Sequence, residues 1–124
     1  MIKHPIGIFI SGRGSNLNSI VKACKEVEFP GEIKVVFSNN INAPGLIFAK
    51  ENNLEVITLD YNNFKNTEDY DKMIIKLLEP YNLRLICLAG YMKILSKKLI
   101  DHYPNKILNI HPSLLPKYKG LNTH

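Results

Sequence analysis

Several features that would mark other classes of protein are missing from this sequence of 124 residues. Two cysteines, Cys24 and Cys87, are too few for a disulfide framework or a cysteine-rich zinc cluster. Both lie in apolar patterns, which predicts reduced core thiols and a cytoplasmic location. No apolar run approaches the roughly 18 residues that a membrane-spanning helix needs, and the first residues lack a signal-peptide pattern. We therefore expect one soluble globular domain, without repeats, linkers or low-complexity segments.

The charge is unbalanced toward basic residues: 16 Lys and Arg stand against 11 Asp and Glu, a formal net charge of +5. Much of the excess lies late in the chain, at Lys93, Lys97, Lys98, Lys106, Lys117 and Lys119. A basic surface attracts phosphates and carboxylate-rich cofactors, although an ordinary solvated face would look the same. These lysines lack the interleaved aromatic residues on which bases stack, so no nucleic-acid partner is predicted.

Short apolar runs alternate with segments of helical periodicity along the chain. The runs predicted to be strands are residues 6–10, 33–37, 54–59, 83–89 and 107–110. The segments predicted to be helices are residues 17–27, 44–49, 70–78 (capped by Asn66 or Thr67 and ending near Pro80) and a short one from Ser96 to near Tyr103. This alternation predicts an α/β fold: a Rossmann-like, doubly wound parallel sheet in three α/β/α layers.

The chain ends in a segment punctuated by Pro and Gly, residues 111–124, directly after a predicted sheet strand. A complete doubly wound domain usually continues past such a strand. We therefore expect residues 1–124 to form a single domain that is incomplete at its C-terminus.

A glycine-rich segment, residues 11–17 (SGRGSNL), joins the first predicted strand to the first predicted helix. Its glycines permit a tight turn, and the N-terminus of the helix presents unpaired N–H groups to a phosphate, with Ser15 and Asn16 as further donors. The segment is not a nucleoside-triphosphate P-loop, and it lacks the third glycine of a dinucleotide site. One phosphate on a small substrate is favoured, with a plain turn capped by Ser15 as the alternative.

Asn109 and His111 stand two residues apart at the end of the last predicted strand. The period of a strand places both side chains on one side of the sheet, and the glycine-rich segment occupies the same edge. An amide N–H can stabilise an oxyanion, and an imidazole can transfer a proton near neutral pH. A core histidine with satisfied hydrogen bonds is the competing interpretation for His111. No second ligand stands near at metal-binding spacing, so no metal is predicted.

Three segments, residues 11–17 (SGRGSNL), 88–95 (LAGYMKIL) and 109–116 (NIHPSLLP), closely resemble the glycinamide ribonucleotide formyltransferases of purine synthesis, a branch of the folate-dependent formyltransferases. The resemblance covers the whole chain in order and spacing. It implies transfer of a formyl group from the co-substrate 10-formyltetrahydrofolate to the amine of glycinamide ribonucleotide. Its partners would then be these small molecules, with no metal, no nucleic acid and no membrane, and the protein would be a monomer or a homodimer.

The resemblance also implies a role for each matching residue. Gly14, Ser15 and Asn16 would hold the 5′-phosphate of the ribonucleotide. The folate would contact Thr67, Met92, Lys93, Ile94, Leu95, Ile107 and Asn109. Asn109 and protonated His111 would stabilise the oxyanion of the tetrahedral intermediate, and His111 would act as general acid. Met92 is an equally good core residue by its chemistry alone.

Two departures from the family pattern bear on these roles. The family orients its catalytic His with an Asp that lies beyond the end of this chain, so residues 1–124 alone are expected to be inactive or nearly so. Thr67 stands near the position where some relatives have an Arg for the folate tail, which leaves Lys93 or water for that contact. The alternatives are a methionyl-tRNA formyltransferase, a formyltetrahydrofolate hydrolase-like enzyme, and an inactive nucleotide-binding domain.

Overall fold

The structure, a computed structural model, describes residues 2–110, so the predictions for residues 111–124, including His111, lie outside it. The strands are β1 (His4–Ile10), β2 (Gly31–Ser38), β3 (Val56–Thr58), β4 (Leu85–Leu88) and β5 (Ile107–Asn109). The α-helices are α1 (Ser15–Cys24), α2 (Pro44–Glu51), α3 (Thr67–Leu78) and α4 (Lys97–His102). Two short 3-10 helices, η1 (Tyr61–Asn63) and η2 (Glu79–Tyr81), flank α3.

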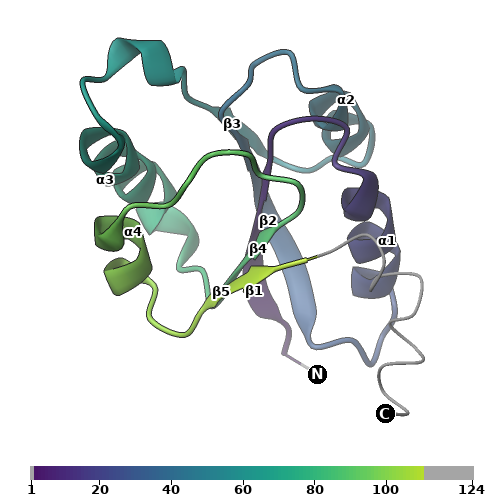
Figure 1. The fold of residues 1–124 in the computed structure, drawn as a ribbon. Helices are drawn as coiled ribbons and strands as arrows, with labels where there is room; N and C mark the ends of the chain where they lie inside the picture. Colours follow the sequence, from purple (N-terminus) through teal and green to yellow (C-terminus); the bar gives the residue numbers. More distant parts are fainter. Residues whose placement is uncertain (1, 111–124) are drawn as a thin grey trace.

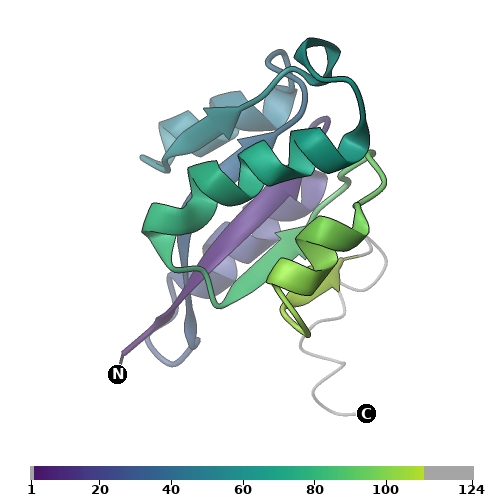
Figure 2. The same cartoon turned by 90° about the vertical axis from the view of Figure 1, so that its left-hand side faces the viewer.

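The strands form one 5-stranded sheet in the order β3-β2-β1-β4-β5, and every neighbouring pair is parallel. Helices α1 and α2 cover one face of the sheet, and α3 and α4 cover the other (Figure 1). Figure 2 shows α3 and α4 in front of the sheet after a quarter turn. The predicted doubly wound α/β fold with three layers is therefore confirmed.

The central strands are apolar on both faces because helices cover both faces. In β1, Ile8 and Ile10 belong to the core beneath α1 and α2, whereas Phe9 between them packs on the α3 side. Strand β2 alternates in the same way, with Val36 in the first core and Phe37 in the second. All five side chains are completely buried, and each such burial contributes roughly 1.5–3 kcal/mol.

Two helices begin at the predicted caps. The Asn66 side chain accepts a hydrogen bond of 2.8 Å from the Asp69 N–H at the start of α3. The Ser96 hydroxyl accepts one of 3.3 Å from the Leu99 N–H at the start of α4. Each cap satisfies an N–H group that has no partner within its own helix, which confirms both predicted starting points.

The prediction that the first helix continues to Val27 is wrong. Helix α1 ends at Cys24, and the Val27 side chain is 81% exposed. The ammonium group of Lys3 donates to the Cys24 carbonyl at 2.6 Å and to the Glu26 carbonyl at 2.8 Å. These carbonyl groups thus find a partner outside the helix, as basic side chains often provide at helix C-termini.

The later strands are shorter than predicted. Residues 54–59, 83–89 and 107–110 shrink to β3, β4 and β5. Within residues 2–110, β3 and β5 each pair with one neighbouring strand, and the ladder of β4 is limited to the residues that face β1 and β5. Pairing nevertheless continues one residue past two strand ends. The Ala89 N–H donates to the Phe9 carbonyl at 2.9 Å, and the Ile110 N–H donates to the Leu88 carbonyl at 3.0 Å.

Both cysteine thiols are free. Cys87 lies in the core, 4% exposed, and its burial raises the pKa of the thiol to about 12. Cys24 is half-buried, and burial also raises its pKa. Among residues 2–110, no helix has the length and apolar character that crossing a membrane requires.

Candidate functional site

The order of the strands reverses between β1 and β4, where β2 and β3 lie to one side and β5 to the other. The loops that follow β1 and β4 therefore lead away from each other, and such a switch point is where open α/β sheets bind ligands. The glycine-rich turn of residues 11–14 follows β1, and the segment of residues 89–96 follows β4. Both lie at the same end of the sheet (Figure 1).

The glycine-rich turn leads into α1 through a glycine cap. Gly14 is the N-cap residue and has a φ of 61°, in the left-handed region that glycine adopts without strain. The Leu17 N–H donates to the Gly14 carbonyl at 2.6 Å. A glycine cap brings no side chain to the first N–H groups, and the first turn has no acidic residue. Those N–H groups and the positive end of the helix dipole are therefore available to an anion.

Helix α2 supports this turn from behind. The Gly45 N–H donates to the Gly12 carbonyl at 3.0 Å. A Cβ atom on Gly45 would lie 2.6 Å from the Arg13 carbonyl oxygen, so the close approach requires glycine. A Cβ atom on Gly12 would meet nothing within 4 Å, which means that the turn is open on that side.

Asn16 joins the turn to the end of β5. Its side chain is 5% exposed, and its amide donates to the Ile110 carbonyl at 3.3 Å, across 94 residues of sequence. The glycine-rich turn and the residue directly before His111 therefore lie at one edge of the sheet. Asn16 thus fastens two segments, a role that its predicted phosphate contact does not include. Ser15 is the first residue of α1, and the phosphate contacts of Gly14, Ser15 and Asn16 stay predictions.

Asn109, the last residue of β5, has an exposed side chain. It pairs in register with Leu88 of β4, and it shares a strand face with Ile107. Ile107 is half-buried and packs against the core on the α3 side. The structure thus brings Asn109 to the edge where the glycine-rich turn lies, and its predicted catalytic role stays a prediction because His111 lies outside the described residues.

The segment after β4 exposes apolar side chains. Met92 is 80% exposed and Ile94 is 85% exposed, so Met92 is not a core residue. Lys93, between these two residues, is half-buried. Leu95, which follows Ile94, is also half-buried and packs against the core on the α3 side. Large exposed apolar side chains near the switch point of a parallel sheet are typical of a binding surface.

Tyr61 brings two of the residues predicted for the folate tail together. The Lys93 ammonium lies 3.2 Å from the centroid of the Tyr61 ring, which is a cation–π contact. The Tyr61 hydroxyl lies 3.3 Å from the Thr67 hydroxyl oxygen. No sequence motif points to Tyr61, because it stands in a polar loop outside every motif.

Ser11 is the first residue of the glycine-rich segment, and no role for its side chain is predicted from the sequence. Its hydroxyl accepts a hydrogen bond of 2.7 Å from the Met92 N–H and donates one of 2.6 Å to the Asn39 side chain. Its carbonyl accepts one of 3.3 Å from the Asn40 amide. The loops after β1, β2 and β4 therefore meet at Ser11.

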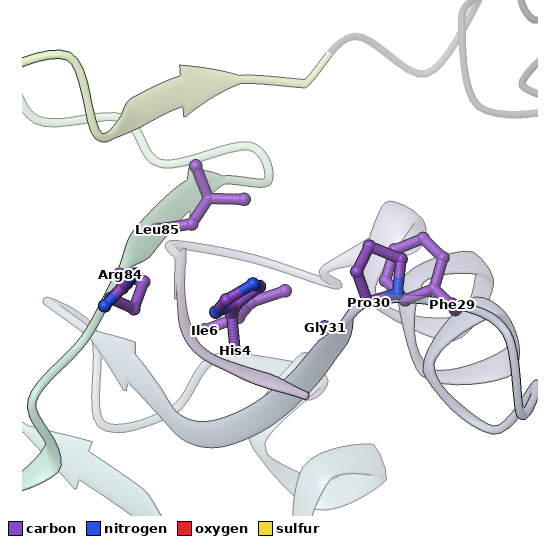
Figure 3. A pocket seen from close by; sticks show the side chains of 7 residues that line it. All are labelled: His4, Ile6, Phe29, Pro30, Gly31, Arg84 and Leu85. Carbon is purple, nitrogen blue, oxygen red and sulfur yellow. The ribbon is translucent and has the colours of Figure 1, made fainter. Parts of the chain in front are cut away.

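A hollow of about 400 Å³ lies at the opposite edge of the sheet, where strands begin. Arg84 and Leu85 at the start of β4 line one side, and Phe29 and Pro30 line the other (Figure 3). None of the predicted site residues lines it. Within residues 2–110, no group of three or more His, Cys, Asp or Glu residues could hold a metal ion.

A parallel sheet with a glycine-rich turn and polar side chains at its switch point defines the doubly wound α/β class that binds nucleotides and related cofactors. A family model described as formyl transferase matches residues 5–124. The chain belongs to the formyl transferase family, as the sequence motifs predict.

Similar proteins of known sequence include a bacterial formyltransferase and a human purine biosynthetic protein. The chain is 44% identical over 119 residues to the phosphoribosylglycinamide formyltransferase of Escherichia coli, covering 96% of this chain and 56% of that protein. It is 36% identical over 122 residues to the human trifunctional purine biosynthetic protein adenosine-3, covering 98% of this chain and 12% of that protein. The chain thus spans about half the length of its bacterial relative.

Solved structures show the same fold. The phosphoribosylglycinamide formyltransferase of Brucella melitensis has a TM-score of 0.85 at 40% identity, and the match covers 98% of this chain and 64% of that one. Glycinamide ribonucleotide transformylase 1 of Symbiobacterium toebii has a TM-score of 0.84 at 34% identity, with 98% and 60% covered.

Proposed function

We propose that this protein transfers a formyl group from 10-formyltetrahydrofolate to the amine of glycinamide ribonucleotide, a reaction of purine synthesis. One observation carries the proposal. The glycine-rich turn, suited to a phosphate, lies at the same sheet edge as exposed Asn109 and is fastened to Ile110 by the Asn16 amide. The printed names of the relatives in this family support the choice of substrates.

The ribonucleotide would be anchored by its phosphate at the start of α1. The Gly14 cap leaves the first N–H groups of the helix available, and the first turn has no carboxylate that would repel an anion. The open space beside Gly12 leaves room for the phosphate or the ribose. The amine of the ribonucleotide would then extend along the crevice toward the end of β5.

The folate would lie against the segment after β4. Exposed Met92 and Ile94 offer apolar surface to a ring system, and the backbone groups of this segment offer hydrogen bonds. Lys93, held over the Tyr61 ring beside Thr67, supplies a positive charge for the carboxylates of the folate tail. The carboxylates of the folate tail need a positive charge from Lys93, because Thr67 cannot form a guanidinium–carboxylate pair with them.

The chemistry follows from this arrangement. The ribonucleotide amine attacks the formyl carbon, and the C=O oxygen gains negative charge in the tetrahedral intermediate. The Asn109 amide donates to that oxygen, and removing one such donor typically costs roughly 10²–10³ in rate. His111, placed here by sequence alone, would protonate the departing folate nitrogen as the carbon–nitrogen bond breaks.

An assay of formyl transfer by the full-length protein tests the proposal directly. We expect tetrahydrofolate release from 10-formyltetrahydrofolate that depends on glycinamide ribonucleotide. His111→Ala should nearly abolish transfer while both ligands still bind. His102→Ala is a matched control, because His102 is an exposed histidine on α4.

Two further assays separate the alternatives. Release that depends on methionyl-tRNA would indicate the tRNA formyltransferase, and release without any acceptor would indicate a hydrolase. Unchanged transfer in His111→Ala would contradict the proposed role of that residue, and no transfer by the unaltered protein would contradict the proposed function.

A further inference from the structure

We propose that Ser11 is a positioning residue that sets the donor-binding segment of residues 92–95 in register with the phosphate-binding turn. This inference rests on the proposed function, since it concerns the alignment of the two substrates. It is carried by one hydroxyl group that contacts both parts of the site: Ser11 belongs to the turn, and its oxygen accepts the Met92 N–H at 2.7 Å.

The direction of these hydrogen bonds follows from the chemistry of a hydroxyl group. A serine hydroxyl has one proton to donate and two lone pairs to accept with. The Ser11 proton goes to the Asn39 side-chain oxygen at 2.6 Å, so the lone pairs are left for the Met92 N–H. Asn39 therefore orients the hydroxyl for its contact with Met92.

The backbone of Ser11 is held from the side of β2. The Asn40 amide donates to the Ser11 carbonyl at 3.3 Å, and the Asn40 N–H donates to the Ser38 hydroxyl at 3.0 Å. Ser38 is completely buried at the end of β2. The end of β2 thus holds Ser11 in place through Asn40, and the Ser11 hydroxyl holds the Met92 N–H.

The donor-binding segment needs such an anchor at its beginning. Gly90, two residues before it, has a φ of 76°, and a Cβ atom there would meet nothing within 4 Å. Tyr91 packs its ring 5.2 Å from the Phe9 ring, which holds the chain to the sheet but not to the glycine-rich turn. The exposed Met92 and Ile94 side chains add little packing. The contact with Ser11 fixes the start of the segment against the turn.

The consequence is a selective effect on the formyl donor. The turn keeps two other anchors, the Asn16 contact with Ile110 and the Gly45 contact with Gly12. We therefore expect Ser11→Ala to raise the KM for 10-formyltetrahydrofolate about tenfold, the loss typical of one hydrogen bond. The KM for the ribonucleotide should change by less than about twofold, because its anchors remain.

The experiment compares full-length Ser11→Ala, Ser11→Thr and Ser19→Ala. The first removes the hydroxyl, the second keeps it, and the third removes the hydroxyl of an exposed serine on α1. The readouts are both KM values, kcat, and the hydrogen-exchange rate of the Met92 amide by NMR. Ser11→Ala should show the KM split and faster Met92 exchange, Ser11→Thr should restore both, and Ser19→Ala should show neither.

Three results would overturn the proposal: unchanged Met92 exchange in Ser11→Ala, an equal rise in both KM values, or a fall in kcat alone. Should Ser11→Ala fail to fold, Asn39→Ala decides in its place. It leaves Ser11 intact but removes the group that orients its hydroxyl, so the same split should appear at about threefold. An inactive unaltered protein would overturn the proposed function instead, while Met92 exchange would still report on the Ser11 contact.

Discussion

The two edges of the parallel sheet differ in what meets there. At the edge where strands begin, an open hollow of about 400 Å³ is bordered by His4, Arg84 and Phe29 (Figure 3). At the edge where strands end, hydrogen bonds join Ser11 to Met92 and Asn16 to Ile110, across 81 and 94 residues of sequence. The first edge offers space, whereas the second brings functional groups from distant segments together.

The difference has a physical cause in the parallel arrangement. Each strand of a βαβ unit ends in a loop that starts a helix, so the positive ends of helix dipoles gather at one edge. At the other edge helices end, and their carbonyl groups attract cations, as the contacts of Lys3 with the Cys24 and Glu26 carbonyls show. Anionic substrates therefore suit the edge where strands end, whatever the size of the hollow at the other edge.

The largest expected difference is between two substitutions, one at each edge of the sheet. Asn109→Ala should lower kcat by roughly 10²–10³, because it removes the proposed donor to the oxyanion. Arg84→Ala should leave kcat unchanged, although it removes an exposed charge that lines the hollow. Steady-state kinetics of formyl transfer by the full-length protein measures both.

Both substitutions are at exposed side chains, so thermal unfolding should change little in either variant. A comparable loss of kcat in Arg84→Ala would mean that the hollow takes part in the reaction. That result would remove the distinction between the two edges.

A smaller effect is expected from two glycines at the edge where strands end. Gly45→Ala should lower the free energy of unfolding by about 1–3 kcal/mol, because its Cβ would lie 2.6 Å from the Arg13 carbonyl oxygen. Gly12→Ala should change it by less than about 0.5 kcal/mol, since nothing lies within 4 Å of the added methyl group. Urea denaturation measures both values.

The same pair of variants separates packing from ligand binding. Gly12→Ala should raise the KM for glycinamide ribonucleotide about tenfold, because the methyl group would occupy the space proposed for the ligand. An unchanged KM would place the ligand elsewhere along the crevice.

The smallest expected effect lies midway between the edges, at Cys87 on β4. Burial raises the pKa of its thiol from 9.0 to about 12, and burial also raises the pKa of Tyr91. Between pH 9 and 12 the unfolded chain loses protons that the folded chain keeps, so stability falls as the pH rises. We expect Cys87 to contribute a loss of about 1 kcal/mol by pH 10.

Urea denaturation at pH 8 and pH 10 measures this loss. Cys87→Ala should be less stable at both values but should lose less between them, because the titrating thiol is gone. An equal loss in both proteins would assign the alkaline effect to other groups. Since Cys87 lies between the two edges, its ionisation should weaken both, unlike the substitutions above.

Local sequence signals placed most of the elements correctly. The Asn66 and Ser96 caps work through neighbours three residues away, so their meaning is contained in a few adjacent residues. The prediction failed at Val27, beyond a helix end where the Cys24 and Glu26 carbonyls accept from Lys3, a residue more than twenty positions earlier. A helical pattern in the sequence cannot show that a distant ammonium group will take the last carbonyl groups.

The candidate site divides in the same way. Motifs pointed to the glycine-rich turn, to residues 92–95 and to Asn109, and the structure brings these to one edge of the sheet. Tyr61 was not predicted as part of the site, and Ser11 was predicted only as the first residue of the glycine-rich segment. Tyr61 matters because the Lys93 ammonium lies over its ring, and Ser11 matters because its hydroxyl accepts the Met92 N–H. Both contacts join loops that follow different strands.

The sequence by itself determined the alternation of strands and helices, the family and the chemical groups of the crevice, because these depend on the identity and spacing of adjacent residues. The tertiary structure alone decided which loops touch, and with it the roles of Ser11, Asn16 and Tyr61. The order β3-β2-β1-β4-β5 sets those contacts, and strand order is a property of the packed sheet that no local pattern contains.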